Sequence, residues 1–108
     1  MRRHEIWTAA GGPGHAGKPR PLLILQNESI DAVSVTTCGF TSQVFEVREV
    51  RPLVPWSIDN GLRRDSCVMV DKIMTLPRKL IGQRLGRLSP DDSAEVDRAL
   101  LLFLGLSV

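Results

Sequence analysis

Histidine and cysteine side chains could do chemistry here, but they are few and far apart. His4 and His15 are the only histidines, and a glycine-rich stretch separates them. Cys38 and Cys67 have no partner at metal-ligand spacing, and we expect both to be buried free thiols of a cytoplasmic protein. The chain also lacks a P-loop and a Gly-x-Ser-x-Gly elbow. The sequence therefore predicts neither a bound metal nor a cofactor.

The basic residues occur in clusters. The formal net charge is only +2, which neither demands nor excludes a polyanionic partner. The clusters are Lys18 with Arg20, Arg63 with Arg64, and a later stretch of Arg78, Lys79, Arg84 and Arg87. The acidic residues of the last segment are Asp91, Asp92, Glu95 and Asp97. This placement is typical of a protein with one basic face. The alternative is a scatter of solvated charges.

Length and composition indicate one small globular domain, residues 1–108. A chain of 108 residues with 43% apolar residues buries a modest core. The aromatic residues, few for a stacking platform that binds single strands, are Trp7, Phe40, Phe45, Trp56 and Phe103. No apolar run follows the basic N-terminus, so no signal peptide is predicted. The leucine-rich residues 100–106 are too short to span a bilayer, and we expect no membrane contact.

Short apolar and β-branched runs between turn residues predict a mainly β fold. The predicted strands are residues 6–8, 21–25, 33–40, 50–54, 67–70, 73–76 and 83–88. The run 21–25 is the most apolar, which favours a strand buried on both faces. Residues 11–19 contain four glycines and two prolines and are predicted to form a loop. Asn60-Gly61 predicts a tight turn.

One helix is predicted at the end of the chain. Ser89 is its expected N-cap, Pro90 fits its first turn, and Gly105 is expected to end it. The apolar side chains that recur at helical spacing are Val96, Ala99, Leu100, Phe103 and Leu104. This stripe is broader than one face requires, so part of it needs cover from a partner subunit or from the rest of the chain. Strands at this spacing with one helix predict a small, strongly bent sheet or barrel.

Four segments, taken together in this order and spacing, carry a more specific signal. They are residues 2–7, residues 18–27 with Arg-Pro before an apolar run, residues 40–43 (Phe-Thr-Ser-Gln), and residues 60–66 continued by 70–73 and 86–89. This arrangement resembles the MazF/PemK family of toxin endoribonucleases over nearly the whole chain. The resemblance implies an SH3-like, strongly curved sheet or small barrel with a C-terminal helix, of the MazF/PemK/CcdB type. It also implies a homodimer.

The resemblance further implies an activity and its partners. Single-stranded RNA is expected to lie in a groove across the dimer interface. It is expected to be cut without metal by attack of a 2′-hydroxyl, which leaves a 2′,3′-cyclic phosphate and a 5′-hydroxyl. A cognate antitoxin is expected to block the groove with an acidic segment.

Two functional positions of the family match residues of this chain, Arg20 in Arg-Pro and Thr41 in Thr-Ser-Gln. The guanidinium of Arg20 suits the charge that builds on phosphate oxygens during the attack, and the hydroxyl of Thr41 can donate to the same phosphate. The residues expected to contact RNA are Lys18, Ser42, Gln43 and Trp56. Without the family resemblance, Arg20 would be interpreted as a solvated residue at the end of a loop and Thr41 as an ordinary residue at the end of a strand. Trp56 would be interpreted as a residue that packs at the edge of a surface site.

His15 marks a departure from the family. Some members carry a glutamate five residues before the Arg-Pro arginine, and His15 holds that place here. An imidazole can both take and give a proton near neutral pH, so His15 is a candidate general acid or base. The alternative is a loop residue without a catalytic role.

Two other functions fit the same fold. One is a non-catalytic toxin that poisons DNA gyrase by binding it, which would make Arg20 and Thr41 incidental. The other is an inactive relative that only sequesters an antitoxin. The Arg-Pro and Thr-Ser-Gln segments argue against the first, because a gyrase binder does not need them.

Overall fold

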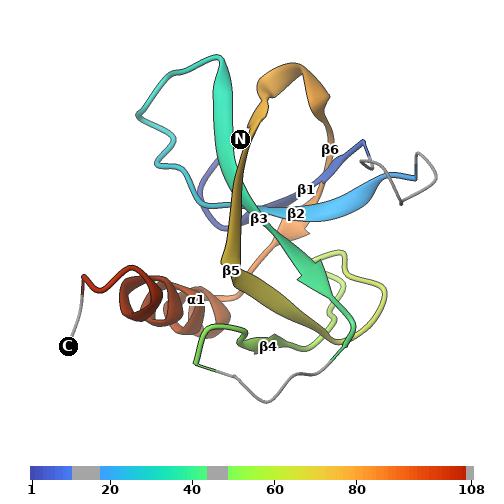
Figure 1. Ribbon diagram of the computed structural model, residues 1–108. Helices are drawn as coiled ribbons and strands as arrows, with labels where there is room; N and C mark the ends of the chain where they lie inside the picture. Colours follow the sequence, from blue (N-terminus) through green and yellow to red (C-terminus); the bar gives the residue numbers. More distant parts are fainter. Residues whose placement is uncertain (11–17, 44–48, 107–108) are drawn as a thin grey trace.

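A computed structural model describes residues 1–10, 18–43 and 49–106, which form one sheet and one C-terminal α-helix (Figure 1). The strands are β1 (Glu5–Ala9), β2 (Arg20–Ile24), β3 (Ser34–Thr41), β4 (Leu53–Val54), β5 (Ser66–Pro77) and β6 (Ile81–Arg87). A 3₁₀ turn (Arg78–Leu80) joins β5 to β6, and α1 spans Pro90–Phe103. The strand order is β4-β5-β3-β2-β1-β6, with antiparallel neighbours throughout. The predicted mainly β fold with a strongly curved sheet and a terminal helix is confirmed.

The strands predicted at 67–70 and 73–76 are one continuous strand, so this part of the prediction was wrong. The charged residues between them are part of β5, opposite a register shift: Cys38 of β3 pairs with Ile73, but Phe40 pairs with Val68. Asp71 is accommodated because Arg51 binds both its carboxylate oxygens at 3.0 Å. The interruption in the sequence pattern therefore corresponds to an irregularity within β5.

The strand predicted over 50–54 is shorter in the structure, where only Leu53–Val54 is strand. These two residues pair with Cys67 and Ser66 at the edge of the sheet. Prolines at 52 and 55 lack the N–H that a ladder requires, which confines the strand to the residues between them.

The core lies between the curved sheet and α1. Leu22, Leu23 and Ile24 are all buried, which confirms that β2 has no solvent-exposed face at these positions. Leu23 belongs to the main core cluster, to which the helix contributes Val96 and Ala99, whereas Ile24 belongs to a second, smaller cluster. Both cysteines are buried free thiols, as predicted, and burial raises the pKa of the Cys38 thiol to about 12.

The predicted helix boundaries are confirmed. The Ser89 side chain accepts a hydrogen bond from the Asp92 backbone N–H at 3.1 Å, and Pro90 is in the first turn. Gly105 adopts a φ of 72°, the left-handed conformation that ends many helices. Of the predicted stripe, Val96 and Ala99 are buried, whereas Phe103 is 44% exposed.

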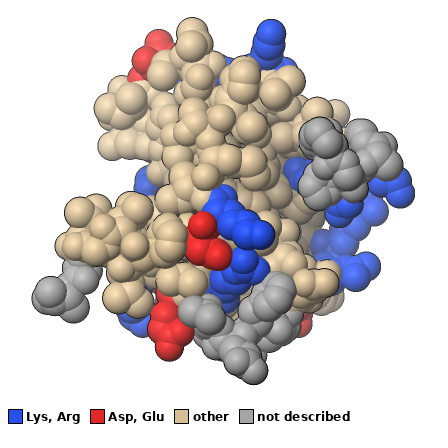
Figure 2. Space-filling model, in the orientation of Figure 1, with Lys and Arg blue, Asp and Glu red and all other residues tan. Residues whose placement is uncertain are grey.

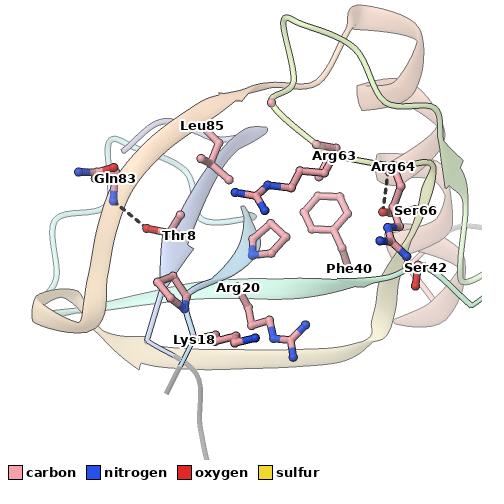
Figure 3. A pocket seen from close by; sticks show the side chains of 14 residues that line it. Thr8, Lys18, Arg20, Phe40, Ser42, Arg63, Arg64, Ser66, Gln83 and Leu85 are labelled. Atoms are coloured by element: carbon pink, nitrogen blue, oxygen red, sulfur yellow. Dashed lines mark hydrogen bonds between the residues drawn. The ribbon is translucent and has the colours of Figure 1, made fainter. Parts of the chain in front are cut away.

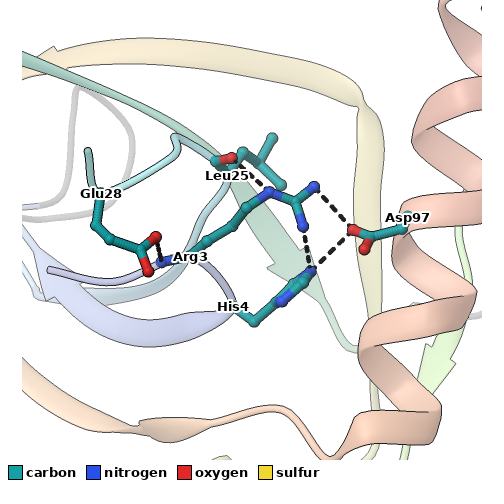
Figure 4. Close-up of polar contacts among 5 residues, drawn as sticks. All are labelled: Arg3, His4, Leu25, Glu28 and Asp97. Carbon is teal, nitrogen blue, oxygen red and sulfur yellow. Dashed lines mark hydrogen bonds and ion pairs between the residues drawn. The ribbon is translucent and has the colours of Figure 1, made fainter. Parts of the chain in front are cut away.

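A polar cluster attaches the N-terminus to α1 (Figure 4). Arg3 donates from Nε to the Leu25 carbonyl, and its guanidinium lies 2.8 Å from the Asp97 carboxylate. The His4 Nε2 atom lies 2.8 Å from the same carboxylate oxygen. Burial alone raises the pKa of Asp97, but the hydrogen bonds from Arg3 and His4 outweigh it and lower the pKa overall.

We expect the Asp97 cluster to stabilise the fold at neutral pH and to lose its effect in acid. A carboxyl whose folded pKa is lowered stabilises the protein above its unfolded pKa, about 3.9, and that contribution disappears as pH falls through the folded value. Because Asp97 is partly exposed, Asp97→Asn should lower the free energy of unfolding at pH 7 by only about 0.5–1 kcal/mol. The difference from wild type should shrink below about pH 4.

Urea unfolding at several pH values measures this effect. Glu95→Gln is the control, because Glu95 lies on the same helix in an exposed pair with Arg98. A difference between Asp97→Asn and wild type that stays constant from pH 7 to pH 2 would contradict the assignment.

Candidate functional site

A groove of about 850 Å³ opens between the two ends of the sheet (Figure 3). Its lining comes from β1, from the start of β2 and the two residues before it, from Phe40 of β3 and Ser42 just after that strand, from residues 61–64, from Ser66 at the start of β5, and from β6. Segments distant in the sequence therefore meet in one concave surface. Residues 59–61 pack closely on Leu85 and Gly86 of β6 at one side of this surface.

The groove is lined by positive charge without a compensating acid. Lys18, Arg20, Arg63 and Arg64 all line it, and none of its lining residues is Asp or Glu. Among the described residues, none of these four side chains forms an ion pair. By contrast, Arg84 on the other face of β6 binds Glu5 at 2.8 Å. A groove lined by unpaired cations has the electrostatic character that attracts anions.

Cations also gather on part of one face of the molecule. Figure 2 shows Lys and Arg side chains gathered along the right-hand edge of one face, and the larger acidic patches elsewhere on it. On the same face, further Lys and Arg side chains lie at the top, in the centre and at the lower left.

One wall of the groove depends on close contact between a turn and β6. Asn60 is buried, and its side-chain oxygen accepts hydrogen bonds from the backbone N–H groups of Ser57 and Leu62. Gly61 has a φ of 72°, and a Cβ there would lie 2.4 Å from the Leu85 carbonyl oxygen. A Cβ on Gly86 would lie 2.2 Å from the Asp59 carbonyl oxygen. These glycines let the predicted Asn-Gly turn pack on β6, and residues 63 and 64 follow it into the groove.

The structure brings together several of the predicted site residues. Lys18, Arg20 and Ser42 line the same groove. Thr41 is not among the lining residues, although its neighbours Phe40 and Ser42 are. The last paired residues of β2 and β3 are Leu22 and Gly39. Arg20 and Thr41 each lie two residues beyond that pair, at the same end of the two strands.

The Thr41 hydroxyl organises the loop that follows it. Its Oγ1 accepts a hydrogen bond from the Gln43 backbone N–H at 3.2 Å. A hydroxyl that accepts one hydrogen bond still has its own proton to donate. Gln43 itself is exposed, and it is not among the residues that line the groove.

Trp56 lies apart from Arg20. Its side chain is 57% exposed and lines a second groove of about 980 Å³, with His4, Arg84 and Arg87 and the first turn of α1. His15 falls outside the described residues, so its predicted role remains a prediction.

Sequence reasoning missed part of the groove. Arg63 and Arg64 were recognised as a basic pair but not assigned to the site, although they follow the Asn-Gly turn directly. Phe40, Thr8 and Gln83 also line the groove and were not singled out as site residues. Their alternation along strands does not reveal which face of the sheet bears a groove.

Two further findings concern the described part of the chain. In residues 1–10, 18–43 and 49–106, no three His, Cys, Asp or Glu side chains come together as a possible metal site. None of the helices in these ranges has the length and apolar character needed to cross a membrane.

Comparison with known proteins gives the family. Residues 2–104 match the model of the PemK-like, MazF-like toxin of type II toxin–antitoxin systems. The chain belongs to this family. A curated relative of the toxin, the probable endoribonuclease MazF of Mycolicibacterium smegmatis, is 42% identical over 108 residues, which is 99% of both chains.

Solved structures share the fold of the toxin. The Mycobacterium tuberculosis toxin MazF-mt6 matches with a TM-score of 0.77 and 26% identity, over 96% of this chain and 99% of the other. A mycobacterial endoribonuclease in complex with its cognate antitoxin matches with a TM-score of 0.79 and 22% identity, over 100% of this chain and 98% of the other.

Proposed function

We propose that this chain is the endoribonuclease of a cytoplasmic toxin–antitoxin pair and cuts single-stranded RNA at specific sequences. The observation that carries the proposal is the groove with four cations and no acid in its lining. Such a surface attracts a phosphate backbone. Membership of the toxin family and the relative named as a probable endoribonuclease support RNA cleavage as the activity. A gyrase binder would leave the cationic groove beside the Arg-Pro segment without a role.

The proposed reaction is an internal phosphoryl transfer. The ribose 2′-oxygen attacks the adjacent phosphorus and loses its proton to a general base. The bond from phosphorus to the 5′-oxygen breaks, and that oxygen receives a proton. The products are a 2′,3′-cyclic phosphate and a 5′-hydroxyl, and no metal ion takes part in the proposed reaction.

Each proposed site residue has a separate role. Arg20 stabilises the charge on the non-bridging oxygens, and Thr41 donates its hydroxyl to the same phosphate. The RNA on either side of the cleaved phosphate is contacted by Lys18, Ser42 and Gln43. His15 acts as the general acid or base that transfers the proton. Contact between RNA and Trp56 requires a strand that extends to the second groove.

Incubation of the purified chain with a long RNA in excess chelator tests the activity. We expect cuts at a short recurring sequence, with cyclic phosphate on one side and a 5′-hydroxyl on the other. Cleavage that stops in chelator and returns with a divalent ion would refute the metal-independent mechanism. Uniform degradation would refute sequence specificity.

We propose that the cognate antitoxin presents an acidic segment to the groove. The four cations of the groove have no ion pair within the described chain and are available to carboxylates. An acidic segment bound there would exclude the phosphates of RNA by occupying the same cations.

We also propose that the active form is a homodimer. The end of α1 and the residues just after it bear five apolar residues that are 43–72% exposed: Leu101, Leu102, Phe103, Leu104 and Leu106. Such a patch on a helix end is suited to burial against a second copy of the chain.

Replacement of two of these side chains by charge should break the dimer. We expect the double substitution Leu102→Glu and Phe103→Glu to weaken self-association by at least about 30-fold, because the loss of even one buried apolar anchor costs about 2 kcal/mol. Sedimentation velocity at micromolar concentration measures this. The control is Ile58→Glu, an exposed apolar residue in the loop before β5. A wild-type chain that sediments as a monomer would contradict the proposal.

A further inference from the structure

The groove contains one ring among its charged side chains. Phe40 is the aromatic residue of its described lining, and it projects into the same space as Arg63 (Figure 3). Its ring also packs against the main core cluster, so one side is supported while another faces the groove. The ring is therefore held in place by the fold instead of moving freely on the surface.

An aromatic ring does not contribute to binding phosphate. Four cations already line the groove, whereas Phe40 offers a flat apolar surface. Nucleobases stack on such surfaces, and each stack contributes about 1–3 kcal/mol to single-strand binding. Single-stranded RNA is recognised largely through bases that are splayed out and stacked in this way. A fixed ring in a cationic groove thus matches both parts of a nucleotide.

Arg63 is placed to read the edge of a base stacked on this ring. In Figure 3 its side chain extends from the segment after the Gly61 turn over the groove, between Leu85 and Phe40. It is exposed and has no ion pair with a described residue. A guanidinium donates two parallel hydrogen bonds, and guanine presents two matching acceptors, N7 and O6, on one edge.

We infer that Phe40 and Arg63 form a base-recognition slot, in which a guanine beside the cleaved phosphate stacks on Phe40 and is read by Arg63. This inference rests on the proposed function, since it assigns the specificity of the same groove. Arg20, at the start of β2, lines the groove with them and holds the phosphate. Phe40 and Arg63 thus act in binding and specificity, separately from the phosphate chemistry.

Cleavage rates at individual sites of a long RNA test the slot. Phe40→Leu should lower kcat/KM at the preferred sequence by about 10- to 100-fold, in keeping with the loss of one stack. It should also flatten the preference for guanine at one position. Phe40→Trp keeps a stacking surface and should retain that preference. Arg63→Lys keeps the charge without the planar fork and should lose the guanine preference while retaining the salt dependence of binding.

Two controls separate recognition from stability. Ile73 also packs, half-buried, against the core cluster of Phe40 but is not among the groove residues, so Ile73→Val reports the effect of a looser core. Arg98→Lys is the same arginine-to-lysine change outside the groove, at an exposed helix residue that pairs with Glu95. Both controls should keep the wild-type base preference.

The outcomes are distinguishable. A changed preference in Phe40→Leu and Arg63→Lys, with both controls unchanged, supports the slot. If the wild-type chain cuts RNA and Phe40→Leu lowers the cleavage rate by the same factor at every site, then Phe40 is only a core residue and the inference is overturned. If the wild-type chain cuts no RNA, the proposed function fails, and this inference fails with it.

Discussion

Arg20→Ala is expected to lower the rate of RNA cleavage by about 10²–10³-fold while leaving the chain folded. The guanidinium lines the groove and has no ion pair among the described residues, so its charge is available to the phosphate. In the attack by the 2′-oxygen, negative charge grows on the non-bridging oxygens, and two parallel hydrogen bonds from arginine stabilise it more in the transition state than in the bound substrate. The loss should therefore be in the chemical step.

Single-turnover cleavage at saturating enzyme measures that step, and thermal unfolding shows whether the fold is intact. Arg20 is exposed at the start of β2, so its removal should shift the unfolding temperature little. Arg20→Lys should recover only part of the rate, because an ammonium lacks the planar fork. Arg98→Ala, outside the groove, is the matched control. Wild-type turnover by Arg20→Ala would remove Arg20 from the mechanism.

Thr41→Ala should have a smaller effect, because a neutral hydroxyl contributes less than a charged donor. The structure adds a second reason for a partial effect. Thr41 Oγ1 accepts from the Gln43 backbone N–H, so its loss also loosens the loop that carries Ser42. Loss equal to or greater than that of Arg20→Ala would reverse this ranking.

The elements that local chemistry specifies were predictable from the sequence. The cap at Ser89, proline at 90 and glycine at 105 define α1, and all three act as expected in the structure. The apolar run of β2 is buried as expected. The errors occurred where tertiary pairing overrides the local pattern. Asp71 is tolerated within β5 because Arg51, 20 residues earlier, binds it.

The candidate site was only partly predictable for a related reason. Arg20 carries a motif signal because proline and an apolar strand follow it. Arg63 and Phe40 lie within segments that carry the family resemblance, but nothing in those segments marks them as groove residues. Their place in the groove depends on the close approach of Gly61 to Leu85 and on which face of β3 the groove occupies. In the structure Phe40 and Ser42 line the groove, and Thr41 between them does not. The sequence pattern does not show which of these side chains lines the groove; that is determined by the curvature of the folded sheet.

The other large effect is expected at His15, where His15→Ala should slow the chemical step by about 10²–10⁴-fold. The chain has two histidines, and His4 lines the second groove, within hydrogen-bond distance of Asp97. His15 lies five residues before Arg20, at the place where some family members carry a glutamate. Removal of the 2′-proton requires a neutral imidazole, and an imidazole ordinarily titrates at about pH 6.5.

A pH–rate profile under single-turnover conditions decides the role of His15. If His15 is the base, the wild-type rate rises as pH passes upward through about 6.5, and His15→Ala removes that inflection. If it is the acid that protonates the 5′-oxygen, the rate falls over the same range. His4→Ala is the matched control, because it removes the other imidazole and should leave the inflection in place. A His15→Ala chain within a few-fold of wild type, with an unchanged profile, would show that another group carries the proton.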